Sequence, residues 1–403
     1  MARILLLENP HSSADDVFTK AGHEIIRVKG ALQGQELIDA LQGVQMLGIR
    51  SKTTVTREVL EACPELVAIG AYCIGTNQID LQAANDNGVA VFNAPYANTR
   101  SVVELAIGEA IALTRHLPEK NDALHRRVWE KSASGAHEVR GKTLGIVGYG
   151  SIGTQLSVLA EALGMRVLFY DIAERLAIGN AKRVRSLGEL LAASDIVSLH
   201  VDGRAANKGF FGRAQMEQMK KGSILINLSR GHIVDIEALC EKLADGTISG
   251  AGIDVFPDEP DANGDPFDSP LIEFPNVFLT PHIGGSTLEA QESIGFFVSG
   301  KMMDYWRKGN TELSVNIPNI ESSPSRSSLY RIGWIHENTP GALARVNQIF
   351  ANAGANINAQ ILATEGEIGY MVTDIQGELP EDAVDLLVAS EQNIRLRVLK
   401  REY

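Results

Sequence analysis

The chain of 403 residues is long enough for two or three domains, each with its own core. Its hydrophobic fraction of 44% and charged fraction of 22% are typical of globular proteins, and a net charge of -13 argues against nucleic acid or an anionic membrane as the main partner. An anionic substrate would therefore need individually placed cations. The three cysteines have no metal-binding spacing, and the N-terminus does not resemble a signal peptide. These features predict a cytoplasmic protein with reduced thiols and no metal.

The first 97 residues alternate short apolar runs with amphipathic stretches. Such alternation predicts parallel strands joined by helices, as in a doubly wound α/β domain. No glycine-rich fingerprint occurs here, so we expect the cofactor elsewhere. The apolar runs are residues 4–7, 24–28, 45–49, 66–69 and 89–92.

A long helix is predicted to begin near Asn98. Ser101 and Glu104 match a capping box, in which the two side chains satisfy free backbone donors at a helix start. Capping therefore explains Glu104 better than a catalytic role does. A polar and basic segment, residues 121–131, leads out of this region.

Residues 142–171 contain the most specific motif of the chain. An apolar run at 144–147 leads into the sequence GYGSIG at 148–153, which opens a helical pattern. A second apolar run then ends on Asp171. A glycine motif set between a strand and a helix, with an acid about 20 residues further on, indicates a dinucleotide-binding Rossmann domain.

Each glycine of this motif has a physical role. Gly148 allows the tight turn, Gly150 lets the backbone approach a pyrophosphate, and Gly153 lets helix and strand pack closely. The free N–H groups in the first turn of the helix favour a diphosphate. Asp171 would bind the ribose hydroxyls and repel a 2′-phosphate, which predicts NAD as the cofactor instead of NADP.

A second series of strand and helix units continues from this motif. Ligands bind beyond the carboxyl ends of the strands in a doubly wound sheet, so polar residues at those ends should share one crevice. An acidic, proline-rich surface loop at 254–276 is expected to flank it. The further runs are 167–170, 196–199, 223–227, 250–253 and 277–279, and the polar residues at their ends are Asp171, His200, Ser229, Arg230, Asp254, Glu259 and His282.

The C-terminal part has a different order of predicted strands and helices. A helix is expected over 286–308, followed by a linker at 321–328. The order of elements after the linker is βαββαβ, which is the ferredoxin-like arrangement. The strands are expected at 329–336, 357–364, 368–375 and 394–398, and the helices at 341–353 and 382–390.

Hydride transfer needs a group that takes the alcohol proton and a group that holds the substrate. A carboxylate beside an imidazole raises its pKa and selects its tautomer, which would suit Glu259 and His282. Arg230 offers a planar fork for a substrate carboxylate. Pattern alone leaves His282 and His200 as equal candidates, and it leaves purely structural roles open for Glu259 and Arg230.

The segments GYGSIG to Asp171, NLSRGHIVD, GIDVFPDEP and TPHIGGS resemble, in order and spacing, the D-isomer-specific 2-hydroxyacid dehydrogenases. The resemblance implies that Arg230, Glu259 and His282 form the catalytic trio. His232 departs from the threonine of many relatives, and Tyr149 stands between the first two glycines. The cofactor residues that it implies are Gly148, Gly150, Ser151, Ile152, Gly153, Asp171, Leu228, Ser229, Arg230, Asp254, His282, Ile283, Gly284 and Gly285.

Further segments, among them AYCIGTNQIDL and VFNAPYANTRSVVELAIGE, resemble the short bacterial members that oxidise 3-phospho-D-glycerate and carry a C-terminal ACT domain. This resemblance implies that Arg50 and Lys52 bind the substrate phosphate. It also implies that L-serine binds to the ACT domain between subunits and inhibits the enzyme. The implied substrate residues are Arg50, Ser51, Lys52, Asn98 and Lys131, and the implied effector residues are His336, Asn338 and Asn356.

The resemblance therefore implies an NAD-dependent oxidation of 3-phospho-D-glycerate to 3-phosphohydroxypyruvate, the first step of L-serine biosynthesis, in a homotetramer joined through its nucleotide-binding and ACT domains. Two other functions stay open, namely reduction of 2-oxoglutarate and NAD sensing by a regulatory protein. A further alternative is that the C-terminal sheet only joins two chains into a dimer and binds no effector. The expected domains are a flavodoxin-like substrate domain (1–97 and 285–320), a Rossmann domain (98–284), a linker (321–328) and an ACT domain (329–403), with a hinge at the two crossings.

Overall fold

The computed structural model describes residues 1–260, 264–325 and 327–400. Residues 261–263 of the predicted acidic loop and residue 326 of the predicted linker lie outside the described part. The chain divides into two compact units. Unit 1 comprises residues 1–97 and 291–403, and unit 2 comprises residues 98–290.

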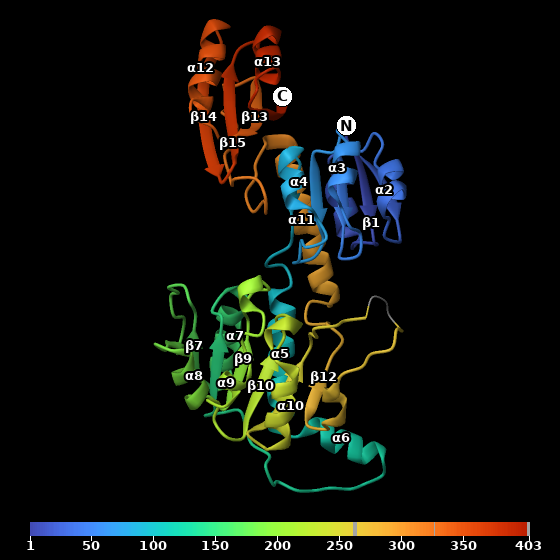
Figure 1. The fold of residues 1–403 in the computed structure, drawn as a ribbon, viewed down its shortest axis with the longest axis vertical. Helices are drawn as coiled ribbons and strands as arrows, with labels where there is room; N and C mark the ends of the chain where they lie inside the picture. Colours follow the sequence, from blue (N-terminus) through green and yellow to red (C-terminus); the bar gives the residue numbers. More distant parts are fainter. Residues whose placement is uncertain (261–263, 326, 401–403) are drawn as a thin grey trace. The chain divides into compact units, whose positions relative to one another are not determined.

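The N-terminal part of unit 1 is a five-stranded parallel sheet in the order β2-β1-β3-β4-β5, drawn in blue in Figure 1. This is the flavodoxin-like order, and it confirms the predicted doubly wound domain. The strands β3 to β5 are buried throughout, which explains their continuous apolar runs. The elements are β1 (Arg3–Leu7), α1 (Ser13–Lys20), β2 (Glu24–Val28), α2 (Gly34–Ala40), β3 (Met46–Ile49), α3 (Arg57–Ala62), β4 (Ala68–Ala71), α4 (Leu81–Asp86) and β5 (Ala90–Phe92).

The long helix α11 (Leu288–Lys308) returns to this sheet. Its apolar residues Val298 and Met302 belong to the same buried cluster as Ile4 and Phe92. The hydroxyl groups of Tyr72, which follows β4, and Ser299 of α11 form a buried hydrogen bond of 2.7 Å. Segments far apart in the sequence therefore make one core.

The C-terminal part of unit 1 is a four-stranded antiparallel sheet in the order β14-β15-β13-β16. Its buried apolar core contains Trp334, Phe350 and Met371, with residues from both helices and from strands β13 and β15. The predicted βαββαβ domain is confirmed. The elements are β13 (Tyr330–Glu337), α12 (Ala342–Asn352), β14 (Asn356–Glu365), β15 (Ile368–Gln376), α13 (Glu381–Val388) and β16 (Asn393–Lys400).

Unit 2 contains a seven-stranded parallel sheet in the order β12-β11-β10-β9-β6-β7-β8. This is the Rossmann order extended by one strand, as predicted apart from the two-residue strand β8. The strands are β6 (Thr143–Val147), β7 (Arg166–Tyr170), β8 (Lys182–Arg183), β9 (Ile196–Leu199), β10 (Ser223–Asn227), β11 (Ile248–Ile253) and β12 (Val277–Leu279). The helices are α5 (Thr99–Thr114), α6 (Leu117–His125), α7 (Ser151–Ala162), α8 (Leu187–Ala193), α9 (Arg213–Met216) and α10 (Ile236–Ala244), with 3-10 turns at Ala205–Asn207, Gly231–Ile233 and Pro270–Glu273.

The predicted capping box at Ser101 and Glu104 is wrong. Helix α5 already begins at Thr99, with Asn98 at its N-cap and no side-chain capping bond. Since Ser101 and Glu104 already lie inside the helix, both side chains take other partners. The hydroxyl of Ser101 pairs with that of Thr287 at 2.7 Å, and Glu104 forms an ion pair with Arg100.

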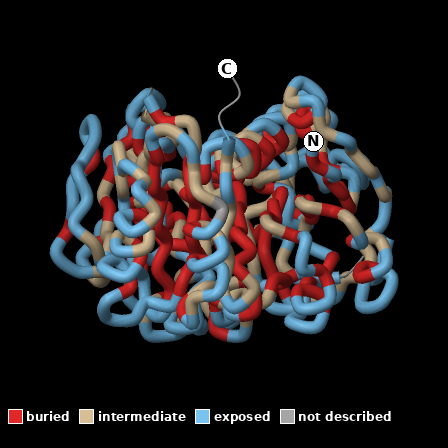
Figure 2. Tube along the Cα trace, turned by 90° about the horizontal axis from the view of Figure 1, so that it is seen from above, coloured by how far each residue is buried: buried red, intermediate tan, exposed pale blue. Residues whose placement is uncertain are grey.

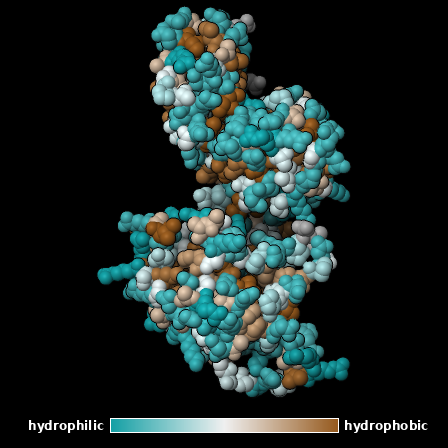
Figure 3. All heavy atoms as spheres, in the orientation of Figure 1, coloured by the Kyte–Doolittle hydropathy of each residue, from teal (hydrophilic) through white to brown (hydrophobic). Residues whose placement is uncertain are grey.

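In Figure 2, buried segments lie in the interior of the trace and exposed segments lie at its periphery. The face in view in Figure 3 is mostly hydrophilic over both units. No helix in the described part of the chain has the length and apolar character that crossing a membrane requires.

Candidate active site

The turn between β6 and α7 has the geometry of a dinucleotide-binding loop. Gly148 has a φ of +93°, and a Cβ at this position would lie 2.5 Å from the carbonyl oxygen of His200. A Cβ on Gly153 would lie 2.3 Å from the carbonyl oxygen of Gly148. Gly150 is the N-cap of α7 without a side-chain cap, and nothing lies within 4 Å of where its Cβ would be. The turn thus leaves the first N–H groups of α7 and the space beside Gly150 for a diphosphate.

Asp171 follows β7, next to this turn. Its Oδ2 accepts a hydrogen bond from the backbone N–H of Tyr149 at 2.7 Å, and its Oδ1 accepts one from Ala173 at 2.8 Å. Each carboxylate oxygen keeps a lone pair for a hydroxyl of a ribose. The ring of Tyr149 is buried and stacks on Phe169, so this departure from the usual motif has a role in packing.

The loop after β12 is held by Asp254 at the end of β11. The Oδ1 of Asp254 accepts hydrogen bonds from the Thr280 hydroxyl at 2.6 Å and the Ile283 N–H at 2.8 Å, and Oδ2 accepts one from the Gly284 N–H at 2.8 Å. Asp254 also accepts the N–H of His282 at its backbone carbonyl. His282 itself has a φ of +52°, a left-handed conformation that is uncommon outside glycine. One buried acid therefore sets the position of the His282 side chain.

His282 and Glu259 form a pair in which Nδ1 of the imidazole lies 2.7 Å from Oε2 of the carboxylate. The Oε1 of Glu259 accepts the N–H of Phe256 at 3.0 Å. The hydrogen bond to Glu259 raises the pKa of His282 against the opposing effect of burial, and Arg230 has a smaller lowering effect. Burial alone would raise the pKa of Glu259, but the hydrogen bonds from His282 and from the Phe256 N–H lower it on balance. The pair leaves Nε2 of His282 available for a proton from another molecule.

Arg230 follows β10, on the strand next to β11. Its Nη1 donates to the carbonyl of Ser229 at 2.7 Å, and its own carbonyl accepts from Nδ2 of Asn227. The Oδ1 of Asn227 accepts from both the N–H and the hydroxyl of Ser229. Asn227 was not among the predicted site residues, although a polar residue that closes a buried strand is a signal for such a role.

His200 has a different environment. Its Nε2 lies 2.8 Å from the hydroxyl of Ser198, and its Nδ1 is buried without a hydrogen-bond partner in the described residues. Burial lowers the pKa of His200 to about 4. This imidazole is neutral at physiological pH and has no carboxylate partner in the described part of the chain.

Two further predicted residues of unit 2 lie at its periphery and at its first helix. Lys131 is exposed in the segment after α6. Asn98 is buried at the start of α5, and its Oδ1 has no hydrogen-bond partner among the residues that the structure describes. A second buried side chain was not predicted. The carboxylate of Glu109 on α5 lies against Gly252 of β11, two residues before Asp254, with no hydrogen bond to either oxygen within the described residues.

The remaining predicted residues belong to unit 1. Arg50, Ser51 and Lys52 follow β3. His336 is buried at the end of β13 and stacks on Trp334.

Along β15, His336 pairs with Gly369, whereas Asn356 pairs with Gln376. These two positions on β15 are about 23 Å apart at the usual rise per residue of a strand. Asn338 follows β13 and donates to the carbonyl of Gly366, at the same end of the sheet as His336. A single chain therefore does not bring Asn356 together with the other two predicted effector residues.

The chain is similar to known proteins over nearly its whole length. A family model described as D-isomer specific 2-hydroxyacid dehydrogenase, NAD binding domain, matches residues 107–284, and one described as AHAS small subunit-like ACT domain matches residues 332–387. The chain is 52% identical to D-3-phosphoglycerate dehydrogenase of Haemophilus influenzae, over 98% of this chain and 97% of that protein. It is 50% identical to the protein of the same name from Escherichia coli K12, with the same coverage. A solved structure of D-2-hydroxyisocaproate dehydrogenase, 25% identical, covers 78% of this chain and 99% of its own, with a TM-score of 0.72.

Proposed function

Because the chain belongs to the D-isomer specific 2-hydroxyacid dehydrogenase family, and is similar to D-3-phosphoglycerate dehydrogenases over nearly its whole length, we propose that it oxidises 3-phospho-D-glycerate to 3-phosphohydroxypyruvate with NAD. This reaction is the first step of L-serine biosynthesis. The observation that carries the proposal is the pair of His282 and Glu259 at the carboxyl edge of the NAD-binding sheet, on a loop held by Asp254.

His282 is the general base in this proposal. Its Nε2 takes the proton of the C2 hydroxyl, while Glu259 holds Nδ1 and stabilises the imidazolium that forms. Arg230 holds the substrate carboxylate with its planar guanidinium and favours negative charge on the C2 oxygen. When bound, NAD supplies the acceptor for the hydride that leaves C2.

The residues around the glycine turn hold the cofactor in this proposal. The first turn of α7, with Gly150, Ser151, Ile152 and Gly153, binds the diphosphate, and Asp171 binds the ribose. The open space at Gly150 supports this assignment. The other proposed contacts are Gly148, Leu228, Ser229, Arg230, Asp254, His282, Ile283, Gly284 and Gly285.

The substrate phosphate is assigned to Arg50 and Lys52, with Ser51, Asn98 and Lys131 as further contacts. Two cations beside each other would also suit the second carboxylate of 2-oxoglutarate. Reduction of 2-oxoglutarate is therefore the second candidate activity.

Feedback inhibition by L-serine is proposed to act through the ACT domain. Since Asn356 and His336 pair with opposite ends of β15, a serine site built from both would take Asn356 from a second copy of the chain. A homotetramer joined through nucleotide-binding and ACT domains would supply that copy. We likewise propose the domain division at residues 97 and 284 and at the linker 321–328.

An assay of NADH oxidation with 3-phosphohydroxypyruvate and with 2-oxoglutarate, each with and without L-serine, tests the proposal. We expect turnover of the phosphorylated substrate and its suppression by serine. Absence of turnover with both substrates would contradict the enzymatic function, and turnover indifferent to serine would remove only the regulation.

The variant His282→Asn should lower kcat by about 10²- to 10⁴-fold with NADH binding retained, because it removes the proton acceptor. His200→Asn is the matched control, since that imidazole is neutral and bound to Ser198. A larger loss of kcat in the control than in His282→Asn would reverse the assignment.

A further inference from the structure

The loop after β3, residues 50–54, carries the two cations to which we assign the substrate phosphate. The side chains of Arg50 and Lys52 form no hydrogen bond or ion pair with any residue that the structure describes. Their guanidinium and ammonium groups are therefore available to a ligand. The position of these cations depends on what holds the backbone of the loop.

A carboxylate from the neighbouring strand holds that backbone. Glu8 directly follows β1, and its Oε1 accepts hydrogen bonds from the N–H groups of Arg50 at 3.1 Å and Thr53 at 2.8 Å. Its Oε2 accepts the N–H of Lys52 at 2.9 Å. Three donors are shared between two acceptor oxygens, which the carboxyl group of a glutamate supplies, whereas an amide side chain offers only one acceptor atom.

The turn that delivers Glu8 is itself conformationally unfavourable. Glu8 and Asn9 have φ values of +60° and +52°, in the left-handed region that favours glycine. Such conformations persist only where the surroundings enforce them, and they cluster at functional sites. The N–H of Glu8 donates to the carbonyl of Gly30 at 3.1 Å.

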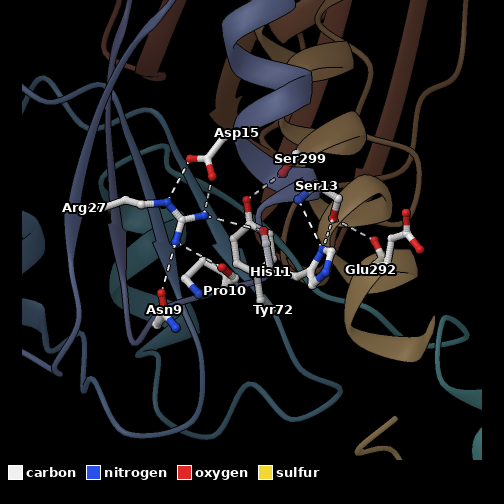
Figure 4. A network of polar contacts seen from close by, with 9 residues as sticks. All are labelled: Asn9, Pro10, His11, Ser13, Asp15, Arg27, Tyr72, Glu292 and Ser299. Carbon is white, nitrogen blue, oxygen red and sulfur yellow. Dashed lines mark hydrogen bonds and ion pairs between the residues drawn. The ribbon is translucent and has the colours of Figure 1, made fainter. Parts of the chain in front are cut away.

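The guanidinium of Arg27 completes the support of this turn. It donates to the carbonyl of Pro10 at 3.0 Å and to Oδ1 of Asn9 at 3.5 Å, while Asp15 binds it at two positions (Figure 4). The strained turn is thus built into the fold, and it directs the Glu8 carboxylate at the neighbouring loop.

Two glutamines take other backbone groups of the same loop. Nε2 of Gln33 donates to the carbonyl of Lys52 at 2.7 Å, and its Oε1 accepts the N–H of Thr54 at 3.1 Å. Nε2 of Gln78 donates to the carbonyl of Arg50 at 2.7 Å. Side chains from outside the loop therefore pair with several of its backbone groups before any ligand binds, and the cationic side chains are left for recognition.

We propose that Glu8 is a positioning residue for substrate recognition, which holds the backbone of Arg50 and Lys52 so that their side chains converge on the phosphate. This inference rests on the proposed function of those two cations. An acid so near a site for an anion would oppose binding, but its three hydrogen bonds disperse its charge over the backbone. The role predicts a specific effect on the phosphorylated end of the substrate.

The test compares 3-phosphohydroxypyruvate with hydroxypyruvate, which lacks the phosphate, using the full-length enzyme and its Glu8→Gln variant. We expect KM for the phosphorylated substrate to rise about tenfold, because the amide loses at least one of the three hydrogen bonds. We expect kcat with this substrate, and kcat/KM for hydroxypyruvate, to change by less than about threefold. Glu36→Gln is the matched control, as an exposed glutamate on α2 that should leave all three values unchanged.

Equal losses with both substrates would show a merely structural role and overturn the inference. Glu8→Asp keeps the charge but shortens its reach, so it should give the same selective rise in KM even if Glu8→Gln fails to fold. The variants Arg50→Gln and Lys52→Gln distinguish a failure of the positioning role of Glu8 from a failure of the phosphate assignment. If they raise KM for the phosphorylated substrate and neither Glu8 variant does, the positioning role is wrong; if they do not raise it, the assignment of the phosphate is wrong.

Discussion

Two strand-end carboxylates, one in each unit, hold a neighbouring loop in the same way. Asp254 accepts three hydrogen bonds from Thr280, Ile283 and Gly284, and Glu8 accepts three from the loop after β3. They differ in burial, because Asp254 is 1% exposed whereas Glu8 is only partly buried. Donors left unpaired in a buried site lose more free energy than donors that water can reach. We therefore expect the buried Asp254 to affect both folding and catalysis, and we expect Glu8 to affect mainly the affinity for substrate.

The largest effect is expected from Asp254→Ala. The Thr280 hydroxyl and the N–H groups of Ile283 and Gly284 would lose their acceptor, which should lower the free energy of unfolding by about 3 kcal/mol. The displaced His282 should lower kcat by about 10²-fold or more. Urea unfolding and steady-state kinetics measure both, with Asp258→Ala as the exposed control. A normal kcat in Asp254→Ala would contradict the comparison.

The second-largest effect is expected on the pH dependence of stability, and it comes from Glu109, a buried carboxyl group near Asp254. Burial, and then the charge of Asp254, raise the pKa of Glu109 from 4.5 to about 8. The folded protein keeps this proton at neutral pH, whereas the unfolded chain releases it above pH 4.5. The free energy of unfolding should therefore fall between about pH 4.5 and 8, by up to about 1.4 kcal/mol per pH unit.

The variant Glu109→Gln should remove this pH dependence, because the amide does not ionise. Urea unfolding of the wild type and the variant at pH 5, 6, 7 and 8 measures the difference in slope. Parallel slopes would mean that Glu109 is already ionised in the folded protein.

The smallest effect is expected from Gln33→Ala, which removes a second support of the loop that Glu8 holds. Its two hydrogen bonds are exposed, so water can replace them when the side chain is removed. KM for 3-phosphohydroxypyruvate should rise no more than about threefold, with kcat unchanged. A rise as large as that of Glu8→Gln would place the support of the loop in Gln33 instead of the carboxylate.

The central strands of the two parallel sheets could be predicted well because they are buried on both faces. The run at 144–147 and the centre of the run at 223–227 are apolar for that reason, and the two runs coincide with β6 and β10 within one residue. Strand β8 has only two residues and no such run. The cap of α5 was assigned wrongly because Ser101 and Glu104 match the sequence pattern of a capping box, whereas their partners in the structure are Thr287 and Arg100.

The candidate site, like the fold, could be predicted from the sequence only in part. Residues at strand ends, such as Glu259 and His282, were expected to meet, and the structure joins them at 2.7 Å. Their catalytic roles stay predictions. Glu8 and Glu109 were not found from the sequence, because their importance comes from partners that are distant along the chain. An acid after a strand or within a helix carries no local sign of the loop or strand that it will contact.

The two ends of unit 2 lie next to each other. The hydroxyl of Ser101 bonds that of Thr287, and a Cβ on Gly285 would lie 2.4 Å from Nδ2 of Asn98. Because its two ends meet, the segment 98–290 can be inserted into the chain as a surface loop can, without moving the residues on either side of it apart. An engineered protein in which unit 2 is replaced by another nucleotide-binding domain should therefore keep Asn98, Ser101, Gly285 and Thr287. With these four residues retained, we expect unit 1 to fold as before.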